Sequence, residues 1–231
     1  PANHSSLATS YNNIGGVYKS MGEYSKALEY YGKSLEIMKK ALPENHPSLA
    51  TSYNNIGGVY DSMGEYSKAL EYHEKSLEIM NKTLSADHPD LATSYNNIGL
   101  IYKSMGEYSK ALEYYEKSFE IRKEALPPNH PSLATSYNNI GLMYNSMGEY
   151  SKALEYHEKS LQIRKKTLPA NHPLLATSYN NIAWVYADKT DYKKALDYFE
   201  RALDIFQLSL PSNHPNIQSV KQSIDFLKEK R

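Results

Sequence analysis

Histidine and asparagine are the residue types whose spacing in this sequence could support chemistry. Six histidines recur every 42 residues, five of them directly before a proline: His4, His46, His88, His130, His172 and His214. An imidazole can bind a metal or transfer a proton, but groups that share one site must lie within ligand or hydrogen-bond distance. Residues in successive structural repeats are about 10 Å apart, so these histidines cannot share a metal. We expect each of them to cap a helix instead.

A pair of adjacent asparagines also occurs once per period. The pairs are Asn12-Asn13, Asn54-Asn55, Asn96-Asn97, Asn138-Asn139 and Asn180-Asn181. Asparagine inside a helix costs roughly 0.6 kcal/mol relative to alanine, so ten of them could cost about 6 kcal/mol. A carboxamide both donates and accepts hydrogen bonds, so it can pair with the N–H and C=O groups of an extended peptide. The alternatives are that the amides bond only to neighbouring helices, or that they persist from recent duplication.

The 42-residue period itself predicts the elements that position these side chains. The chain comprises three leading residues, five units of 42 and 18 remaining residues. A fixed period of this length is typical of a solenoid. In the second unit a first helix should start at Pro47, after a cap at Asn45 or His46, and end at Gly64. Its apolar residues follow each other at spacings of four and three: Leu49, Tyr53, Ile56, Tyr60 and Met63.

A second helix should begin near Tyr66 and pack one apolar face while its outer face carries pairs such as Glu71–Lys75. His73 and His157 occupy the place of aromatic rings in the other units, so we expect them to be packed in the core. The rings in question are Tyr31, Tyr115 and Phe199. Small residues, such as Gly57 with Ala69 and Ser76, mark the expected close crossings of the two helices.

Composition excludes several functional classes. Lys plus Arg and Asp plus Glu both number 26, which argues against nucleic acid and membranes as partners. Cysteine is absent, so disulfides, thiol nucleophiles and thiolate zinc sites are excluded. We find no signal-peptide pattern, no Gly-rich phosphate loop and no Ser/His/Asp grouping. We therefore expect no enzyme activity, catalytic residue, metal or cofactor, and a cytoplasmic location.

At the run from Tyr53-Asn54-Asn55-Ile56-Gly57 through Gly64-Glu65-Tyr66 to Ala69 and Leu77, the chain resembles the tetratricopeptide repeat (TPR) family. Its 42-residue unit with a His-Pro linker is most similar to the repeats of kinesin light chains. The resemblance implies an all-α, right-handed superhelix of five helix–turn–helix units with a C-terminal capping helix. We expect a single TPR solenoid over residues 1–231, with repeats at 4–45, 46–87, 88–129, 130–171 and 172–213 and the cap at 214–231.

The resemblance also implies that the first helix of each unit lines a concave groove, into which the second asparagine of each pair projects. We assign both asparagines of every pair to this groove and expect a ladder that binds the peptide main chain. Three residues beyond the second asparagine the units carry Gly16, Gly58, Leu100, Leu142 and Trp184. A further three residues on, they carry Lys19, Asp61, Lys103, Asn145 and Ala187.

Our hypothesis is that Leu100, Leu142 and Trp184 receive an apolar anchor of the ligand, while Lys19 and Lys103 contact acidic residues. Trp184 could instead pack under the terminal helix. Chaperone-tail binders of this family use Lys and Arg to clamp a terminal carboxylate. Thr and Asn stand at those places here, so that activity is not expected. Asp61 also opposes the two groove lysines, which argues against the acidic cargo of kinesin light chains.

The two ends of the sequence differ. The segment from His214 should form a capping helix with Ile217, Val220, Ile224 and Leu227 turned inward. The N-terminal end shows no cap, because Ser5 replaces the proline and the sequence opens inside a linker, as though excised from a longer array. We expect that an uncapped apolar edge there could self-associate. The favoured function is a non-catalytic module that binds protein or peptide. The alternatives are a structural spacer or self-associating scaffold, or a regulatory segment of a larger enzyme or ATPase.

Overall fold

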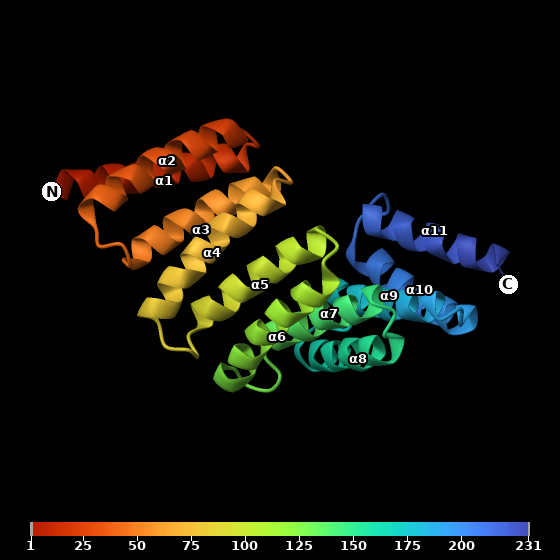
Figure 1. Cartoon of the computed structure of the whole chain (residues 1–231). Helices are drawn as coiled ribbons and strands as arrows, with labels where there is room; N and C mark the ends of the chain where they lie inside the picture. Colours follow the sequence, from red (N-terminus) through yellow and green to blue (C-terminus); the bar gives the residue numbers. More distant parts are fainter. Residues whose placement is uncertain (1, 231) are drawn as a thin grey trace. The chain divides into compact units, whose positions relative to one another are not determined.

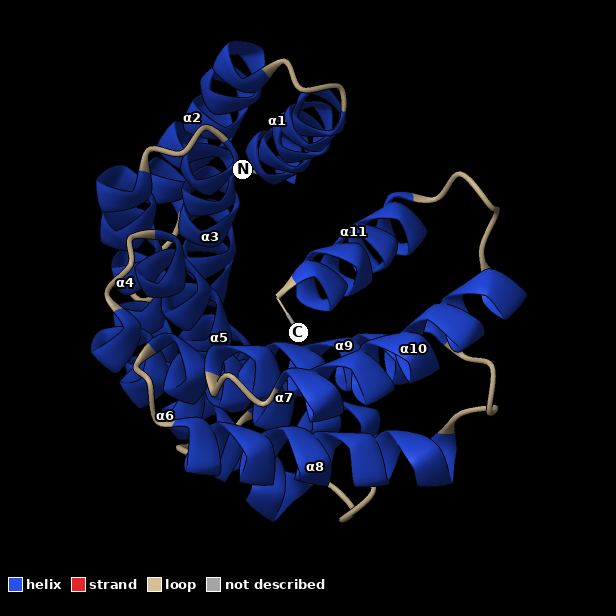
Figure 2. Ribbon diagram, turned by 90° about the vertical axis from the view of Figure 1, so that its right-hand side faces the viewer, coloured by secondary structure: helices blue, strands red, loops and turns tan. Residues whose placement is uncertain are grey.

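The structure is a computed structural model that describes residues 2–230, and side chains from residue 6 to residue 230. This part of the chain is all-helical and contains no strand (Figures 1 and 2). The helices are α1 (Ala2–Ser20), α2 (Tyr24–Ala41), α3 (Pro47–Ser62), α4 (Tyr66–Thr83), α5 (Pro89–Ser104), α6 (Tyr108–Ala125), α7 (Pro131–Ser146), α8 (Tyr150–Thr167), α9 (Pro173–Asp188), α10 (Tyr192–Ser209) and α11 (Pro215–Glu229). They form five helix–turn–helix units and a capping helix, which confirms the predicted fold class. No helix within residues 2–230 combines the length and apolarity that crossing a bilayer requires.

Each His-Pro step starts a helix by the same hydrogen bond. His46 is the N-cap of α3, and its Nδ1 accepts from the backbone N–H of Ser48 at 3.2 Å. The histidine is therefore the cap, and Asn45 is not. Four further helices begin in this way, after His88, His130, His172 and His214. Because Nδ1 is the acceptor, these rings must be unprotonated at Nδ1 for the cap to form. The side chain of His4 lies outside the described residues.

A left-handed residue reverses the chain between the two helices of a unit. Gly64 has φ +74°, just after the last residue of α3, and three other units have a glycine in this conformation. Glycine adopts it without the steric cost that a Cβ introduces. In the fifth unit Thr190 takes the place of glycine with φ 60°. A non-glycine residue in this region is strained, so the fifth turn is less favourable than the others.

The first helix starts earlier than the sequence indicated. We expected the sequence to open inside a linker, with Ser5 in place of the proline, but α1 already includes Ala2. Every other first helix starts at a proline, whose ring disfavours helical backbone in the residue before it. Ser5 has no such ring, so the helix can continue back toward the N-terminus.

The chain divides into two compact parts, residues 1–121 and 122–231, which we call unit 1 and unit 2. The five 42-residue repeats are always named by ordinals, as the first to the fifth unit. In unit 1, α1 packs on α2, α2 on α3, α3 on α4 and α4 on α5. In unit 2, α7 packs on α8, α8 on α9, α9 on α10 and α10 on α11. Ile217, Val220, Ile224 and Leu227 of α11 are buried in that last interface, as predicted. The single continuous solenoid over residues 1–231 stays a prediction.

Within a unit, glycine allows an aromatic ring to lie directly on the first helix. A Cβ on Gly57 would stand 2.8 Å from the His73 ring and 3.2 Å from the Ala69 carbonyl oxygen. Both distances are too short, so the predicted crossing of Gly57 and Ala69 is confirmed. Ser76 has a different partner, because its Oγ donates to the Ala50 carbonyl at 2.8 Å.

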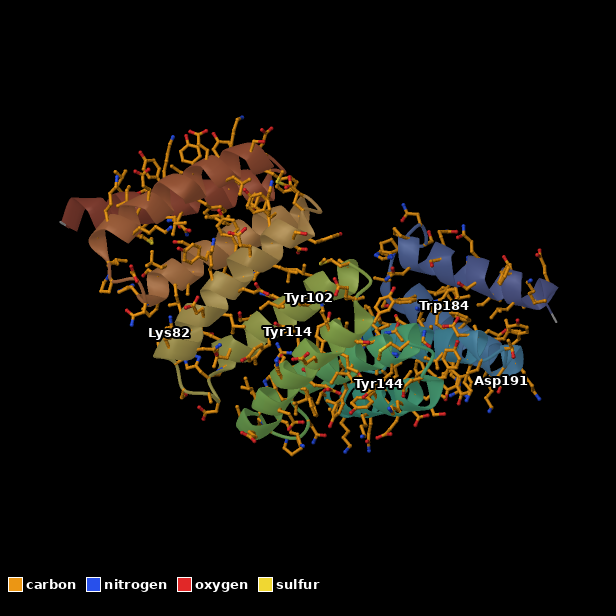
Figure 3. All side chains as sticks on the ribbon, viewed as in Figure 1. Lys82, Tyr102, Tyr114, Tyr144, Trp184 and Asp191 are labelled. Atoms are coloured by element: carbon orange, nitrogen blue, oxygen red, sulfur yellow. The ribbon has the colours of Figure 1, made fainter. Side chains whose placement is uncertain are left out.

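Tyrosine rings also pack between the two helices of each repeat. In the third unit Tyr114 of α6 stacks on Tyr102 of α5 with ring centroids 5.4 Å apart, and it also meets Tyr95 at 6.2 Å (Figure 3). Lys117 lies over Tyr114 at 5.0 Å, which adds a cation–π contact. Comparable triplets occur in the other units. The abundance of tyrosine is thus a property of the repeat architecture.

Candidate functional site

The predicted site residues belong to the first helices of the repeats, and they are described separately for each of the two compact units. We use the term groove face for the second asparagine of each pair and the residues three and six positions later, on α1, α3 and α5 in unit 1 and on α7 and α9 in unit 2. Asn13 is exposed on this face, whereas the other second asparagines are half-buried: Asn55, Asn97, Asn139 and Asn181. All of them retain access to solvent, so each can reach a ligand.

Hydrogen bonds link asparagines of neighbouring repeats. In unit 1, Asn55 Nδ2 donates to Asn12 Oδ1 at 2.9 Å. In unit 2, Asn181 Nδ2 donates to Asn138 Oδ1 at 2.7 Å. The second asparagine of one repeat therefore binds the first asparagine of the preceding one, as the alternative interpretation of the amides proposed. A carboxamide has two N–H donors and two acceptor lone pairs, so each bonded amide still keeps capacity for a ligand.

The corresponding asparagine–asparagine hydrogen bond between α3 and α5 is absent. Asn54 Oδ1 is buried and has no hydrogen-bond partner, so the Asn97 amide does not repeat the bond that Asn55 makes to Asn12. An unpaired buried oxygen costs roughly 1–3 kcal/mol. Helix α3 thus carries an unsatisfied acceptor, and Asn97 of α5 is half-buried.

The residues next to the asparagines change the character of the groove face along the chain. Gly16 and Gly58 expose backbone in the first two repeats, and Leu100 of α5 is 43% exposed. In unit 2 Leu142 is half-buried and Trp184 is 43% exposed. Trp184 meets Phe199 of α10 edge-on, with ring centroids 5.3 Å apart, and Figure 3 labels its position. The indole therefore has one side on the core and another available to a ligand.

Lys19 is held across the gap between the first two repeats. Its Nζ lies 2.8 Å from the position that a Cβ on Gly58 would take. Burial raises the pKa of Asp61, and the charge of Lys19 offsets part of this effect. Lys19 therefore already stabilises a carboxylate of this chain. This arrangement weakens the expectation that Lys19 is free for an acidic ligand; Lys103 is half-buried on α5.

Two polar contacts of unit 2 were not predicted. Asn145 Nδ2 donates to Asp188 Oδ2 at 2.8 Å, with the same offset of 43 residues as the asparagine pairs. Arg164 is buried, and its Nη1 donates to Ser178 Oγ at 2.8 Å and to the Leu174 carbonyl at 3.0 Å. One signal was present in the sequence for Arg164: its place in the unit holds Met38, Met80, Arg122, Arg164 and Phe206 in turn.

His73 and His157 are buried in the core, as predicted. Burial lowers the pKa of both rings to about 4, with smaller effects from the charges of Lys19 and Arg164 respectively. Both rings are therefore neutral at physiological pH, and neither is exposed to a substrate. Among the described residues no group of three or more His, Asp or Glu side chains is arranged to hold a metal ion.

In each repeat two antiparallel helices pack together, with a small residue of the first helix under an aromatic ring of the second. Within each compact unit, the second helix of one repeat packs on the first helix of the next. This arrangement defines a helical-repeat protein. The family model for the tetratricopeptide repeat matches residues 6–82, 62–124 and 132–207. The chain belongs to the tetratricopeptide repeat family.

Solved structures agree with this assignment. A Podosopora anserina protein, provisionally designated a kinesin light chain with nearly identical TPR-like repeats, is 26% identical with a TM-score of 0.78, covering 90% of this chain and 99% of its own. BtubC (BKLC) from P. vanneervenii is 25% identical with a TM-score of 0.78, over 93% of this chain and 85% of its own. The apo form of RapI shares the fold at 21% identity and a TM-score of 0.77, over 96% and 84%. No curated protein sequence matches the chain significantly.

Proposed function

We propose that this chain is a non-catalytic module that binds an extended peptide segment on its groove face, through the second asparagine of each pair. Tetratricopeptide repeats generally mediate protein–protein interaction. The observation that carries the proposal is the presence of accessible asparagines on the groove face in each compact unit, where inter-repeat hydrogen bonds fix the orientation of Asn55 in unit 1 and of Asn181 in unit 2. Preorganised polar groups bind more tightly, since less side-chain entropy is lost when the ligand arrives.

The hydrogen bonds between asparagines of neighbouring repeats leave hydrogen-bonding groups that can recognise a peptide main chain. Asn55 and Asn181 each use one N–H to bind the preceding repeat, so the amide oxygen and the other N–H remain for the ligand. An extended peptide offers one N–H and one C=O per residue, which such an amide can pair with. The ladder then recognises an extended conformation and is tolerant of sequence.

The apolar groove residues supply selectivity. Leu100 in unit 1 and Trp184 in unit 2 are both 43% exposed, and both belong to the groove face. An apolar ligand side chain beside either of them would bury surface that now faces water. We therefore infer that the ligand carries apolar anchor residues, and that Lys19, whose charge already acts on Asp61, contributes less to ligand selection.

A peptide-array experiment tests the proposal. An array of short random peptides is probed with the intact chain and with a variant that combines Asn97→Ala and Asn139→Ala. A matched control combines Asn81→Ala and Asn171→Ala, two exposed asparagines away from the groove face. We expect the groove variant to lose binding by about tenfold or more while the control keeps it. Equal binding by the wild-type chain and a folded groove variant would show that the amides do not hold the ligand.

A further inference from the structure

A cavity of about 690 Å³ lies between α2, α3 and α4 within unit 1. Its volume is in the range of ligand sites in proteins. Tyr53 of α3 lines it together with the apolar side chains of Leu42, Leu49 and Ile79. Tyr53 and Asn55 are two residues apart in a helix, so their side chains point about 160° apart. The cavity therefore lies on another side of α3 than the groove face.

The charged residues of this cavity are three lysines and two glutamates: Lys39, Lys75, Lys82, Glu44 and Glu78. Lys82, labelled in Figure 3, pairs with Glu78 at 2.6 Å, and this hydrogen bond lowers the pKa of the Glu78 carboxyl below its usual range. Lys75 pairs with Glu71, one turn earlier on α4. These two ammonium groups are therefore already neutralised by carboxylates of their own helix.

Lys39 has no carboxylate partner within the described part of the chain. Its Nζ lies over the Tyr53 ring, 5.5 Å from the ring centroid, which orients the ammonium group without neutralising it. Glu44 also lines the cavity, but it is exposed on the linker between α2 and α3 and forms no ion pair with Lys39. A ligand carboxylate beside Lys39 would thus meet an uncompensated positive charge next to the apolar side chains of Leu42 and Ile79.

The corresponding cavity one repeat further along has the opposite charge. It lies between the α4–α5 linker, α5 and α6, and three glutamates and one lysine line it: Glu113, Glu116, Glu120 and Lys117. In that repeat Asn81 takes the place of Lys39, and Asp87 takes the place of Asn45. A carboxylate would be repelled there, so the free positive charge at Lys39 is particular to the first cavity and is not a general property of the repeat.

We propose that the cavity at Lys39 binds an acidic side chain of a partner protein, with the carboxylate on Lys39 and an adjacent apolar side chain against Tyr53 and Leu42. Attraction between opposite charges selects the acidic residue, and the burial of apolar surface supplies affinity. Because the cavity and the groove face lie on different sides of α3, the chain can hold this segment while another segment occupies the groove face. The cavity is a second contact site that does not use the asparagines.

A comparison of two peptide sets tests this proposal. Capped peptides of about nine residues with a central Leu-Glu-Leu are compared with the same peptides carrying Leu-Gln-Leu. The wild-type chain should bind the glutamate peptides about fivefold more tightly. Lys39→Asn, which copies the next repeat, should abolish this preference. Lys40→Asn is the matched control, because it removes the same charge from an exposed lysine that pairs with Glu36 at 2.7 Å and does not line the cavity.

A further variant separates the cavity from the groove face. The chain that combines Asn97→Ala and Asn139→Ala should keep its preference for the glutamate peptides, and circular dichroism verifies that every variant is folded. Equal binding of the two peptide sets by the wild-type chain would overturn the proposal. The same preference in Lys39→Asn and Lys40→Asn would also overturn it, as would loss of the preference in the asparagine variant.

Discussion

Replacing His157 by phenylalanine should make unit 2 less sensitive to acid. His157 is 1% exposed, and neither of its ring nitrogens has a hydrogen-bond partner. A neutral imidazole must carry a proton on one nitrogen, so at least one donor or acceptor is buried unsatisfied, which costs roughly 1–3 kcal/mol. Phe199 fills the equivalent place in the fifth unit and is fully buried. We expect His157→Phe to raise the free energy of unfolding by about 1 kcal/mol at neutral pH, after some loss to tighter packing.

The pH dependence gives the larger effect. The folded pKa of His157 is lowered from 6.5 to about 4, chiefly by burial. Below the ordinary pKa the unfolded chain binds a proton that the folded chain does not, so stability falls as the pH falls from 6.5 toward 4. Between about pH 7.5 and 4.5 this ring should therefore lower the free energy of unfolding by roughly 2–3 kcal/mol. The advantage of the phenylalanine variant should grow by that amount over the same interval.

The assay follows urea unfolding by the fluorescence of Trp184, the single tryptophan of the chain, which packs against Phe199 within unit 2. Tyr115→Phe is the matched control, because it changes the ring at the same place of the third unit without a group that titrates in this range. Burial raises the pKa of Tyr115 to about 12. If the difference between His157→Phe and wild type is the same at both pH values within about 0.5 kcal/mol, the inference that His157 is buried and neutral is wrong.

Three further predictions concern single positions. Gly141→Ala should destabilise the chain by about 2 kcal/mol in urea unfolding, because the new Cβ would lie 2.9 Å from the His157 ring. Gly58→Ala should cost less than about 0.5 kcal/mol, because its Cβ would meet only Lys19 Nζ, the end of a flexible side chain that can shift, and its backbone is helical. Arg164→Met should be neutral or stabilising, because Met38 and Met80 fill this place in other units and no buried charge then remains; a loss above about 2 kcal/mol would contradict this. Trp184→Ala should weaken peptide binding by about tenfold while the chain stays folded by circular dichroism; unchanged affinity would remove Trp184 as an anchor.

The helices could be predicted from the sequence because each boundary has a local chemical cause that recurs every 42 residues. Pro47 fixes the start of a helix, Gly64 supplies the left-handed residue of the turn, and the apolar spacing identifies the buried side. At Ser5 the proline is missing, and there the predicted start was wrong. The exposed fractions of Leu100 and Trp184 follow from the same periodicity, since both lie three residues after an accessible asparagine.

The hydrogen-bond partners could not be predicted in this way. Whether Asn55 bonds to Asn12 depends on how far α3 slides along α1, and a period of residues contains no information about that displacement. The burial of Arg164 depends on the space left by Ser178 and Leu174 of the next helix. The missing hydrogen bond between Asn54 and Asn97 could not be predicted either, because these two residues are of the same type as the bonded pairs in the other repeats.

The constant offset of 43 residues between bonded side chains has a consequence for how such a chain can change length. Each bond joins one repeat to its immediate predecessor, as between Asn138 and Asn181. A gene rearrangement that inserts or removes a whole number of 42-residue units would place an equivalent asparagine at the same step, so the new junction keeps the residues that this bond requires. A slip of any other length would separate the partners. The coding sequence can thus gain or lose repeats by unequal crossing-over while every junction stays compatible.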